Sequence, residues 1–260
     1  MFDAHCHLDF DAFDTDRADL LQRARDVGVQ GFIVAGVDPD GWARQQALAT
    51  TEPDVYATFG LHPWVVSQWT REQVQNGLDQ LAKSVEFAVG ETGLDQSRHC
   101  PPSSMGIQEE AFRAQLALAR ERDLAVVLHI LGAHGKAIDI LESDGVGHAG
   151  GMVHSYSGSA ELVPRYEALG LYISFAAGIT RPNARRTLEA ARAVSADRLL
   201  VETDCPDQIP HGRDGKRNLP EWLPDMVEAL ADARGEIPDT LGRQCAENTR
   251  TLFGLEDATP

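Results

Sequence analysis

The sequence predicts a (β/α)8 barrel, the TIM-barrel architecture, from three observations: its length, its alternation of short apolar runs with longer amphipathic ones, and the number of alternations. A chain of 260 residues has the length of one such barrel. Alternating strands and helices predict a parallel sheet with helices outside, and eight units in this length favour closure, with a doubly wound open sheet as the alternative. The predicted strands are Met1–His7, Gly31–Ala35, Val55–Gly60, Phe87–Glu91, Ala125–His129, Gly151–His154, Leu171–Phe175 and Arg198–Glu202.

The segments between these strands carry helical periodicity and capping signals. Asp16–Val27 places its apolar residues on one face. Asp38 followed by Pro39 is typical of an N-cap with proline at the first helical position. Thr70 and Gln73 have the spacing of a capping box. Two more segments are predicted helices, the second of them an extra C-terminal one: Glu109–Arg122 and Asp239–Leu252.

No shift of composition, internal repeat or low-complexity segment divides the chain. Residues 1–260 are therefore predicted to form a single domain. The least regular stretches, Ser97–Ser104 and Cys205–Leu219, are predicted to be loops on the face of the barrel that carries the site.

Charge and composition exclude several classes of protein. The formal charge of −17 argues against a protein that coats nucleic acid through a basic surface, but not against an enzyme that meets phosphate at one metal site. The N-terminal residues lack the features of a signal peptide, and no run approaches about 18 apolar residues, so we expect a cytoplasmic protein without a membrane span. The four cysteines show no Cys-x-x-Cys spacing and are predicted to be reduced thiols.

Metal-ligand residue types recur at the carboxyl ends of the predicted strands, where a barrel gathers its catalytic groups. Five of the nine histidines belong to this set. Imidazole and carboxylate groups are suitable ligands for a transition-metal ion. Each residue alone has a structural explanation, such as a hydrogen-bonded core histidine or a helix cap, but the joint pattern favours a site. The set is His5, His7, His62, Glu91, His129, His154 and Asp204.

The His5-Cys6-His7 triplet anchors this prediction. Side chains two apart on a strand project from the same side, roughly 6–7 Å from each other, so both imidazoles can converge on one ion. Cys6 is predicted to point the other way, toward the helix layer.

Glu91 lies among glycines, and a carboxylate can bridge two cations. We therefore expect Glu91 to join an ion on the His5/His7 pair to a second ion on His129 and His154. Asp204 would complete the shell of the first ion and accept a proton from the attacking water. These two carboxylates, Glu91 and Asp204, are the predicted catalytic residues.

The other candidates are weaker. His99, His134, His148 and His211 are predicted to be solvated. The sequence has no glycine-rich phosphate loop and no Gly-x-Ser-x-Gly elbow, so neither nucleotide binding nor serine hydrolysis has support. The one local basic cluster is read either as a solvated loop or as a phosphate contact: Arg213, Lys216 and Arg217.

These motifs together resemble the TatD family of metal-dependent hydrolases, within the amidohydrolase-like superfamily. The resemblance spans nearly the whole chain through segments 3–9, 60–63, 89–95, 128–129, 153–158 and 202–206, and ends at Asn248 and Leu252-Phe253. It implies a TIM barrel with one or two divalent ions, drawn from Zn, Mn, Mg, Ni or Fe. By motif position it implies that His62 lines the substrate site and that the ligands are His5, His7, Glu91, His129, His154 and Asp204.

The resemblance also implies a deoxyribonuclease acting on nucleic-acid ends, but the chain departs from the family at three places. Relatives carry His-x-Arg where this chain has His129-Ile130-Leu131, tyrosine where it has Gln96, and Asn-Glu-Pro where it has Asn218-Leu219-Pro220. Because a positive group is missing, Arg213 or Arg217 is predicted to replace it at the substrate.

Three functions follow, in order of preference. The first is a phosphodiesterase using metal-activated water. The second is a hydrolase of a carbonyl substrate (amide, lactone or aminoacyl ester), with Ile130 and Leu131 lining an apolar pocket. The third is a metal-binding protein without catalysis. The sequence determines neither the metal nor the oligomeric state.

Overall fold

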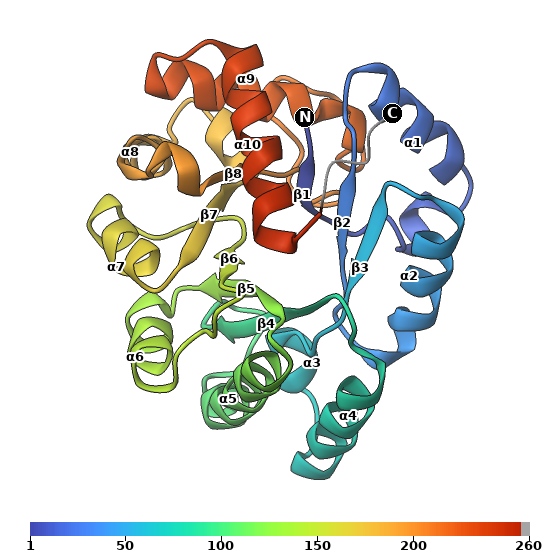
Figure 1. Ribbon diagram of the computed structural model, residues 1–260, viewed down its shortest axis with the longest axis vertical. Coiled ribbons are helices and arrows are strands. Elements are labelled where there is room, and N and C mark those ends of the chain that lie inside the picture. Colours follow the sequence, from blue (N-terminus) through green and yellow to red (C-terminus); the bar gives the residue numbers. More distant parts are fainter. Residues whose placement is uncertain (256–260) are drawn as a thin grey trace.

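The computed structural model describes residues 1–255 and shows parallel strands arranged as a barrel with helices on its outside (Figure 1). The predicted TIM barrel is confirmed, while residues 256–260 of the predicted domain lie outside the described part. The eight strands are β1 (Asp3–Cys6), β2 (Phe32–Ala35), β3 (Val55–Thr58), β4 (Ala88–Asp95), β5 (Ala125–Leu131), β6 (Gly151–Val153), β7 (Leu171–Phe175) and β8 (Leu199–Val201).

Backbone hydrogen bonds close the barrel at two seams. Strands β1–β3 form one parallel sheet and β4–β8 another. Phe59 joins them at one seam, because its N–H donates to Ala88 O and it pairs with Val89. At the other seam, beside the site, the N–H of Asp204 donates to His5 O at 2.9 Å and the N–H of His7 donates to Cys205 O at 2.8 Å.

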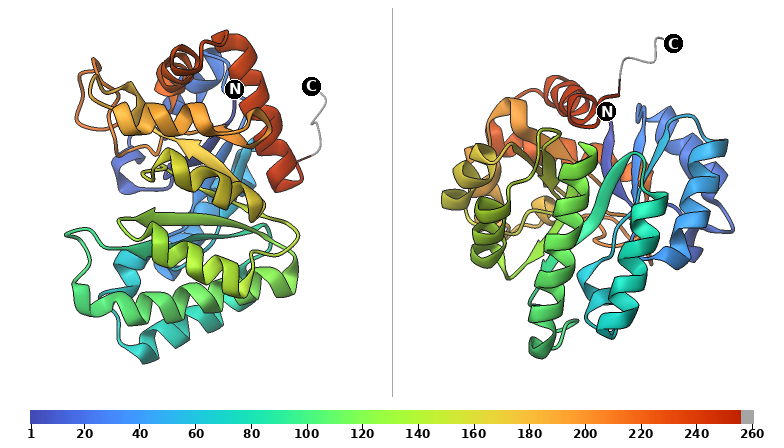
Figure 2. Two further views of the ribbon diagram at one scale, coloured as in Figure 1. Left: turned by 90° about the vertical axis from the view of Figure 1, so that its left-hand side faces the viewer. Right: turned by 60° about the horizontal axis from the view of Figure 1, so that its bottom comes forward.

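The helices pack around this barrel (Figure 2). Two predicted start signals are confirmed: Asp38 accepts from Asp40 N and Gly41 N before Pro39, and Thr70 and Gln73 form a reciprocal capping box. The helices are α1 (Arg17–Asp26), α2 (Pro39–Thr51), α3 (Pro63–Val66), α4 (Arg71–Ser84), α5 (Met105–Arg122), α6 (His134–Asp144), α7 (Val163–Ala168), α8 (Arg185–Ala193), α9 (Leu223–Arg234) and α10 (Pro238–Phe253). None of the described helices is long and apolar enough to cross a membrane.

Two apolar layers stabilise the fold. The larger lies between strands and helices and includes Cys6, as predicted. The smaller lies inside the barrel, where α10 contributes Leu252 and Phe253. Phe253 stacks on Phe87 with ring centroids 5.5 Å apart, so α10 covers the mouth opposite the site.

Strand β1 changes its alternation just where the site begins. Ala4 packs inside the barrel, so strict alternation would send Cys6 inside as well and His5 outward. Instead Cys6 joins the outer layer and His5 and His7 face the interior, because the pairing with β2 is irregular between Asp3 and Cys6. A similar irregularity in β4, between Val89 and Thr92, accompanies the inward turn of Glu91.

Several predicted boundaries are wrong. Strand β4 continues for four residues past Glu91, and β5 continues for two past His129, so both side chains project from within a strand rather than from its end. Helix α5 begins at Met105, before the predicted Glu109. These extensions pair with each other, from Gly93 with His129 to Asp95 with Leu131, which explains why neither strand stops at its ligand-type residue.

Candidate metal centre

Glu91 is the centre of the site and is 2 % exposed. Its Oε2 lies 3.4 Å from His5 Nε2 and 3.6 Å from His7 Nε2. Its Oε1 lies 2.7 Å from His154 Nε2 and 2.9 Å from His129 Nδ1. One carboxylate therefore lies beside two pairs of imidazoles: Oε2 faces His5 and His7, and Oε1 faces His129 and His154.

The first pair converges with Asp204. His5 Nε2 and His7 Nε2 lie 3.3 Å apart, and each is 3.6 Å from Asp204 Oδ1. Asp204 follows β8 with a φ of 57°, in the left-handed region, which turns its side chain back toward β1.

Contacts at the far nitrogens of three histidines indicate which nitrogen faces inward, and in His7 and His129 these contacts are hydrogen bonds. His7 Nδ1 lies 3.1 Å from Ala35 O, so it donates and leaves the Nε2 lone pair toward the site. His129 Nε2 lies 2.9 Å from Asp95 Oδ2, which leaves Nδ1 for the site. His154 Nδ1 lies 3.4 Å from Glu202 Oε1, which supports the ring from behind.

His62 has the opposite arrangement. Its Nδ1 accepts the N–H of Trp64 at 3.0 Å, so the proton of the neutral ring resides on Nε2. That Nε2 lies 3.3 Å from Glu91 Oε1. Because burial lowers the pKa of His62 to about 4, the ring is neutral and Nε2 is a hydrogen-bond donor rather than a lone-pair ligand.

Mutual charge holds the carboxylates ionised. Burial opposes ionisation of Glu91, but the surrounding imidazoles, with His154 the largest contributor, outweigh it and bring the pKa of Glu91 well below its usual range. Burial also opposes ionisation of Asp204, and contact with His7 together with the charges of His154 and His5 lowers its pKa to about 2. The site thus presents anionic oxygens at neutral pH.

These donors fit divalent metal ions. Three groups of buried side chains each bring their ligand atoms within 4.8 Å of one another: His5–His7–Asp204, His5–Glu91–His154 and His62–Glu91–His129. Nitrogen and oxygen ligands in buried, convergent positions with supported histidine rings are the chemistry that Zn²⁺ and related ions require. The hydrogen-bond direction at His62 separates it from the other members of these groups.

Comparisons with known proteins agree with this geometry. The family described as "TatD related DNase" matches residues 2–254. The chain belongs to the TatD family. It is 36% identical to a "3'-5' ssDNA/RNA exonuclease TatD" from Erwinia billingiae over 98% of this chain and 99% of that protein. It is 33% identical to the "uncharacterized metal-dependent hydrolase YabD" of Bacillus subtilis, over 98% and 99%. The crystal structure of the TatD homologue YJJV from Escherichia coli superimposes with a TM-score of 0.88 at 34% identity, covering 98% of both chains.

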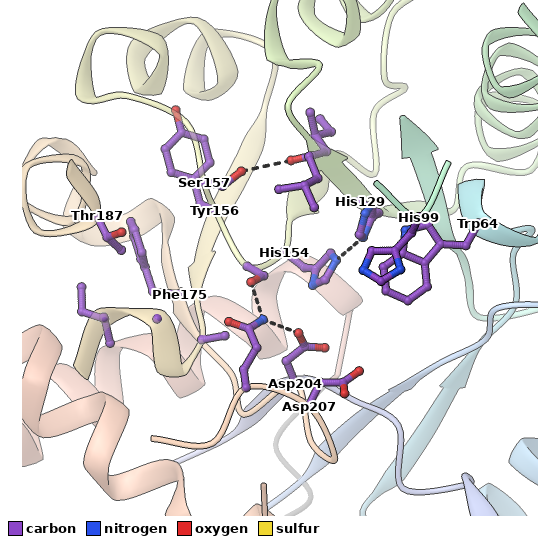
Figure 3. A pocket seen from close by; sticks show the side chains of 17 residues that line it. Trp64, His99, His129, His154, Tyr156, Ser157, Phe175, Thr187, Asp204 and Asp207 are labelled. Carbon is purple, nitrogen blue, oxygen red and sulfur yellow. Dashed lines mark hydrogen bonds between the residues drawn. The ribbon is translucent and has the colours of Figure 1, made fainter. Parts of the chain in front are cut away.

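A cavity of about 590 Å³ opens beside the metal centre of this TatD-family chain. His129, His154 and Asp204 lie at one side of it, and Phe175, Tyr156 and Thr187 lie at the other (Figure 3). Both departures noted on strand β5, Ile130 and Leu131, belong to its lining.

Gln208 is a site residue that the sequence did not single out. Its Nε2 donates to Asp204 Oδ2 and, at 2.7 Å, to Ser155 Oγ (Figure 3). Asn218 holds the loop by donating to Gln208 O at 3.1 Å and to Thr203 O at 2.7 Å. Gln208 thereby occupies one oxygen of Asp204 and leaves Oδ1 facing the imidazoles. No motif spacing connects these loops, so the sequence offered no signal for the contact.

Arg213 and Arg217 lie outside the cavity lining. Arg213 pairs with Asp225 at 2.6 and 2.7 Å, and Arg217 pairs with Asp16 at 2.5 Å. Their predicted substrate contacts stay predictions, and each would require the arginine to leave its carboxylate.

Two of the remaining histidines have defined surroundings. The prediction of a solvated His134 is wrong: it is buried at the start of α6, with Tyr166 Oη 2.9 Å from its Nδ1 and Ser157 Oγ 3.1 Å from its Nε2. His99 is exposed, as predicted, but it stacks on Trp64 at 4.6 Å and lines the cavity.

Proposed function

We propose that this TatD-family chain is a divalent-metal-dependent phosphodiesterase that hydrolyses the ends of DNA strands. The observation that carries the proposal is the Glu91 carboxylate, which faces one imidazole pair with each oxygen. Divalent ions at such a paired site lower the pKa of water and neutralise the charge of the attacking and leaving oxygens of a phosphodiester. The name of the Erwinia relative, 3'-5' ssDNA/RNA exonuclease, supports nucleic-acid ends as the substrate.

The ligands divide between two positions. His5, His7 and Asp204 would hold one ion, and His129 and His154 would hold the other, with Glu91 shared between them. This nitrogen and oxygen set suits Zn²⁺, Mn²⁺, Ni²⁺ or Fe²⁺, and Mg²⁺ as an exchanging ion.

Two side chains act on protons. Asp204 is ionised and Gln208 occupies its Oδ2, so Oδ1 is the oxygen that accepts a hydrogen bond, and then a proton, from the attacking water. His62 presents Nε2–H toward Glu91. This N–H would donate a hydrogen bond to a substrate oxygen and so stabilise the negative charge that develops on that oxygen.

Cleavage of end-labelled single-stranded DNA tests this function. Purified protein is stripped with chelator and reloaded with Zn²⁺, Mn²⁺, Ni²⁺, Fe²⁺ or Mg²⁺, and the products are resolved by size. We expect stepwise shortening from an end that depends on metal and that His129→Ala abolishes. Failure to cut with any of these ions, while esters or amides are turned over, would overturn it.

The cavity lining favours a second candidate, hydrolysis of a carbonyl substrate such as an amide, lactone or aminoacyl ester. Among the described residues that line the cavity there is no lysine or arginine, and Ile130 and Leu131 stand where the family carries an arginine. A parallel screen of esters, amides and phosphodiesters on the same preparation, with His129→Ala as the blank, distinguishes the two. If the protein hydrolyses none of the carbonyl substrates, this second candidate function is wrong.

A further inference from the structure

We infer that the end of the cavity away from the metal centre binds one uncharged, ring-bearing group, the terminal nucleoside of the strand, and selects ends without a terminal phosphate. The inference rests on the proposed function. We define the apolar limb as the part of the cavity lined by Leu131, Tyr156, Phe175 and Ile179. Figure 3 shows Phe175 and Tyr156 on the side of the cavity away from His129.

The limb ends against the core. Phe175 is 1 % exposed and Tyr156 is 3 % exposed, and both pack in the layer between strands and helices. Their rings meet edge to face with centroids 6.1 Å apart. Because the limb stops at this pair, it can hold a terminal group but not a continuing strand. Its surface of aromatic and branched aliphatic side chains suits a planar ring.

The side-chain hydroxyls of two residues around the limb, Tyr156 and Ser157, already have partners. Tyr156 Oη donates to Ser159 O at 2.8 Å, so this hydroxyl does not offer its proton to a group in the limb. Ser157 Oγ donates to Ile130 O at 3.3 Å and lies 3.1 Å from His134 Nε2. A charged group entering the limb would lose its hydration without gaining a hydrogen bond from either residue.

The charges of the lining oppose a second phosphate. Its carboxylates are Asp204, in the metal centre, and Asp207, which is exposed. Both lie at the metal end of the cavity (Figure 3), and the described lining includes no lysine or arginine, so a terminal phosphate in the limb would have no cationic side chain of the lining as a partner. Arg186 lies on α8, outside the cavity lining, but its positive charge acts on Tyr156. The variant Arg186→Gln therefore measures how much this charge affects binding of a phosphate in the limb.

The first test is the rate of hydrolysis of three strands of one sequence, carrying at the cleaved end a hydroxyl, a phosphate, or a hydroxyl on a residue that lacks its base. We expect the phosphate end and the baseless end each to lower kcat/KM by roughly 5- to 150-fold, the range of one stacked base. Leu131→Arg should speed the phosphate end and slow the hydroxyl end.

A second test needs no turnover. Calorimetric titration of metal-free protein with thymidine and with thymidine 3'-phosphate should show tighter binding of thymidine, and Leu131→Arg should reverse the order. Ile237→Arg is the matched control, because Ile237 is 69% exposed and outside the cavity lining. It should change neither test.

Equal rates on all three strands, or the same binding order in wild type and Leu131→Arg, would overturn the apolar limb as a nucleoside site. A phosphate-end preference that disappears in Arg186→Gln would overturn it as well. If no strand is cut but thymidine still binds in the expected order, the proposed phosphodiesterase fails and the limb stands. If strands are cut without end preference, the limb fails and the phosphodiesterase stands.

Discussion

The two sides of the cavity are built in opposite ways. On the metal side, the side chains come from separate strands and are either charged or held by two hydrogen bonds. His129, for example, lies between the carboxylates of Asp95 and Glu91. On the limb side, Phe175 and Tyr156 belong to the packed core and present only rings. The difference teaches that, under the proposed function, the reaction and the choice of substrate would depend on separate residues. Changes on one side should therefore leave the properties of the other side intact.

The largest expected effect comes from Glu91→Gln. A neutral amide in place of the shared carboxylate weakens both imidazole groups at once, so we expect kcat/KM to fall on the order of 10³-fold. Metal content measured on the same preparation should fall in parallel. Glu72→Gln, an exposed residue in the first turn of α4, is the matched control and should alter neither quantity. Full activity in Glu91→Gln would contradict the assignment of this carboxylate.

His62→Asn separates chemistry from metal binding on the same side. Asparagine keeps an oxygen to cap α3 but loses the Nε2–H donor. We expect kcat to fall about 10²-fold, as for removal of one transition-state donor, while metal content stays at the wild-type value. Loss of metal in His62→Asn would make His62 a ligand and would overturn the hydrogen-bond argument at Trp64.

The limb side is sensitive to acid through His134. Burial lowers the pKa of His134 to about 4, from the ordinary histidine value of about 6.5. Between pH 6.5 and about 4 the unfolded chain binds a proton that the folded chain does not, so this residue makes the protein less stable as pH falls through that window. The contribution reaches at most about 3 kcal/mol.

Denaturant unfolding of metal-free wild type and His134→Gln at pH 7 and pH 5 measures this effect. Glutamine can still bond Tyr166 and Ser157 but does not titrate, so the variant should lose less stability between the two pH values. If both proteins lost the same free energy of unfolding between pH 7 and pH 5, His134 would be protonated in the folded protein at pH 5, against the prediction.

The smallest effect is expected at Arg213. Because its guanidinium is paired with Asp225 at the surface, Arg213→Gln should change stability by no more than about 1 kcal/mol and KM by less than about twofold. A large rise in KM for DNA would instead show that the arginine leaves Asp225 to contact phosphate. That result would connect the loop after β8 to the substrate and weaken the division between the two sides.

The barrel and the residue types of the metal centre could be predicted because they depend on local patterns. Periodicity predicts strands and helices whatever surrounds them, and parallel strands bring their carboxyl ends to one face. The His5-Cys6-His7 triplet needed only strand geometry to predict that its two imidazoles share a side, and the packing of Cys6 in the outer layer agrees.

Other features required the folded chain because they depend on contacts between distant segments. The irregular pairing of β1 with β2 turns His5 inward, and strand alternation alone does not contain that information. Gln208 reaches Asp204 and Ser155 from a loop without a motif. The burial of His134 likewise depends on Tyr166, 32 positions away along the chain.

Sequence alone thus determined the alternation of strands and helices and the shared side of His5 and His7, since both follow from spacing along the chain. Tertiary structure alone decided the partners of each hydrogen bond, the acceptance of the Trp64 N–H by His62 Nδ1 and the apolar lining beside Leu131. Those properties arise only when packing removes water and brings one residue's partner from another part of the chain.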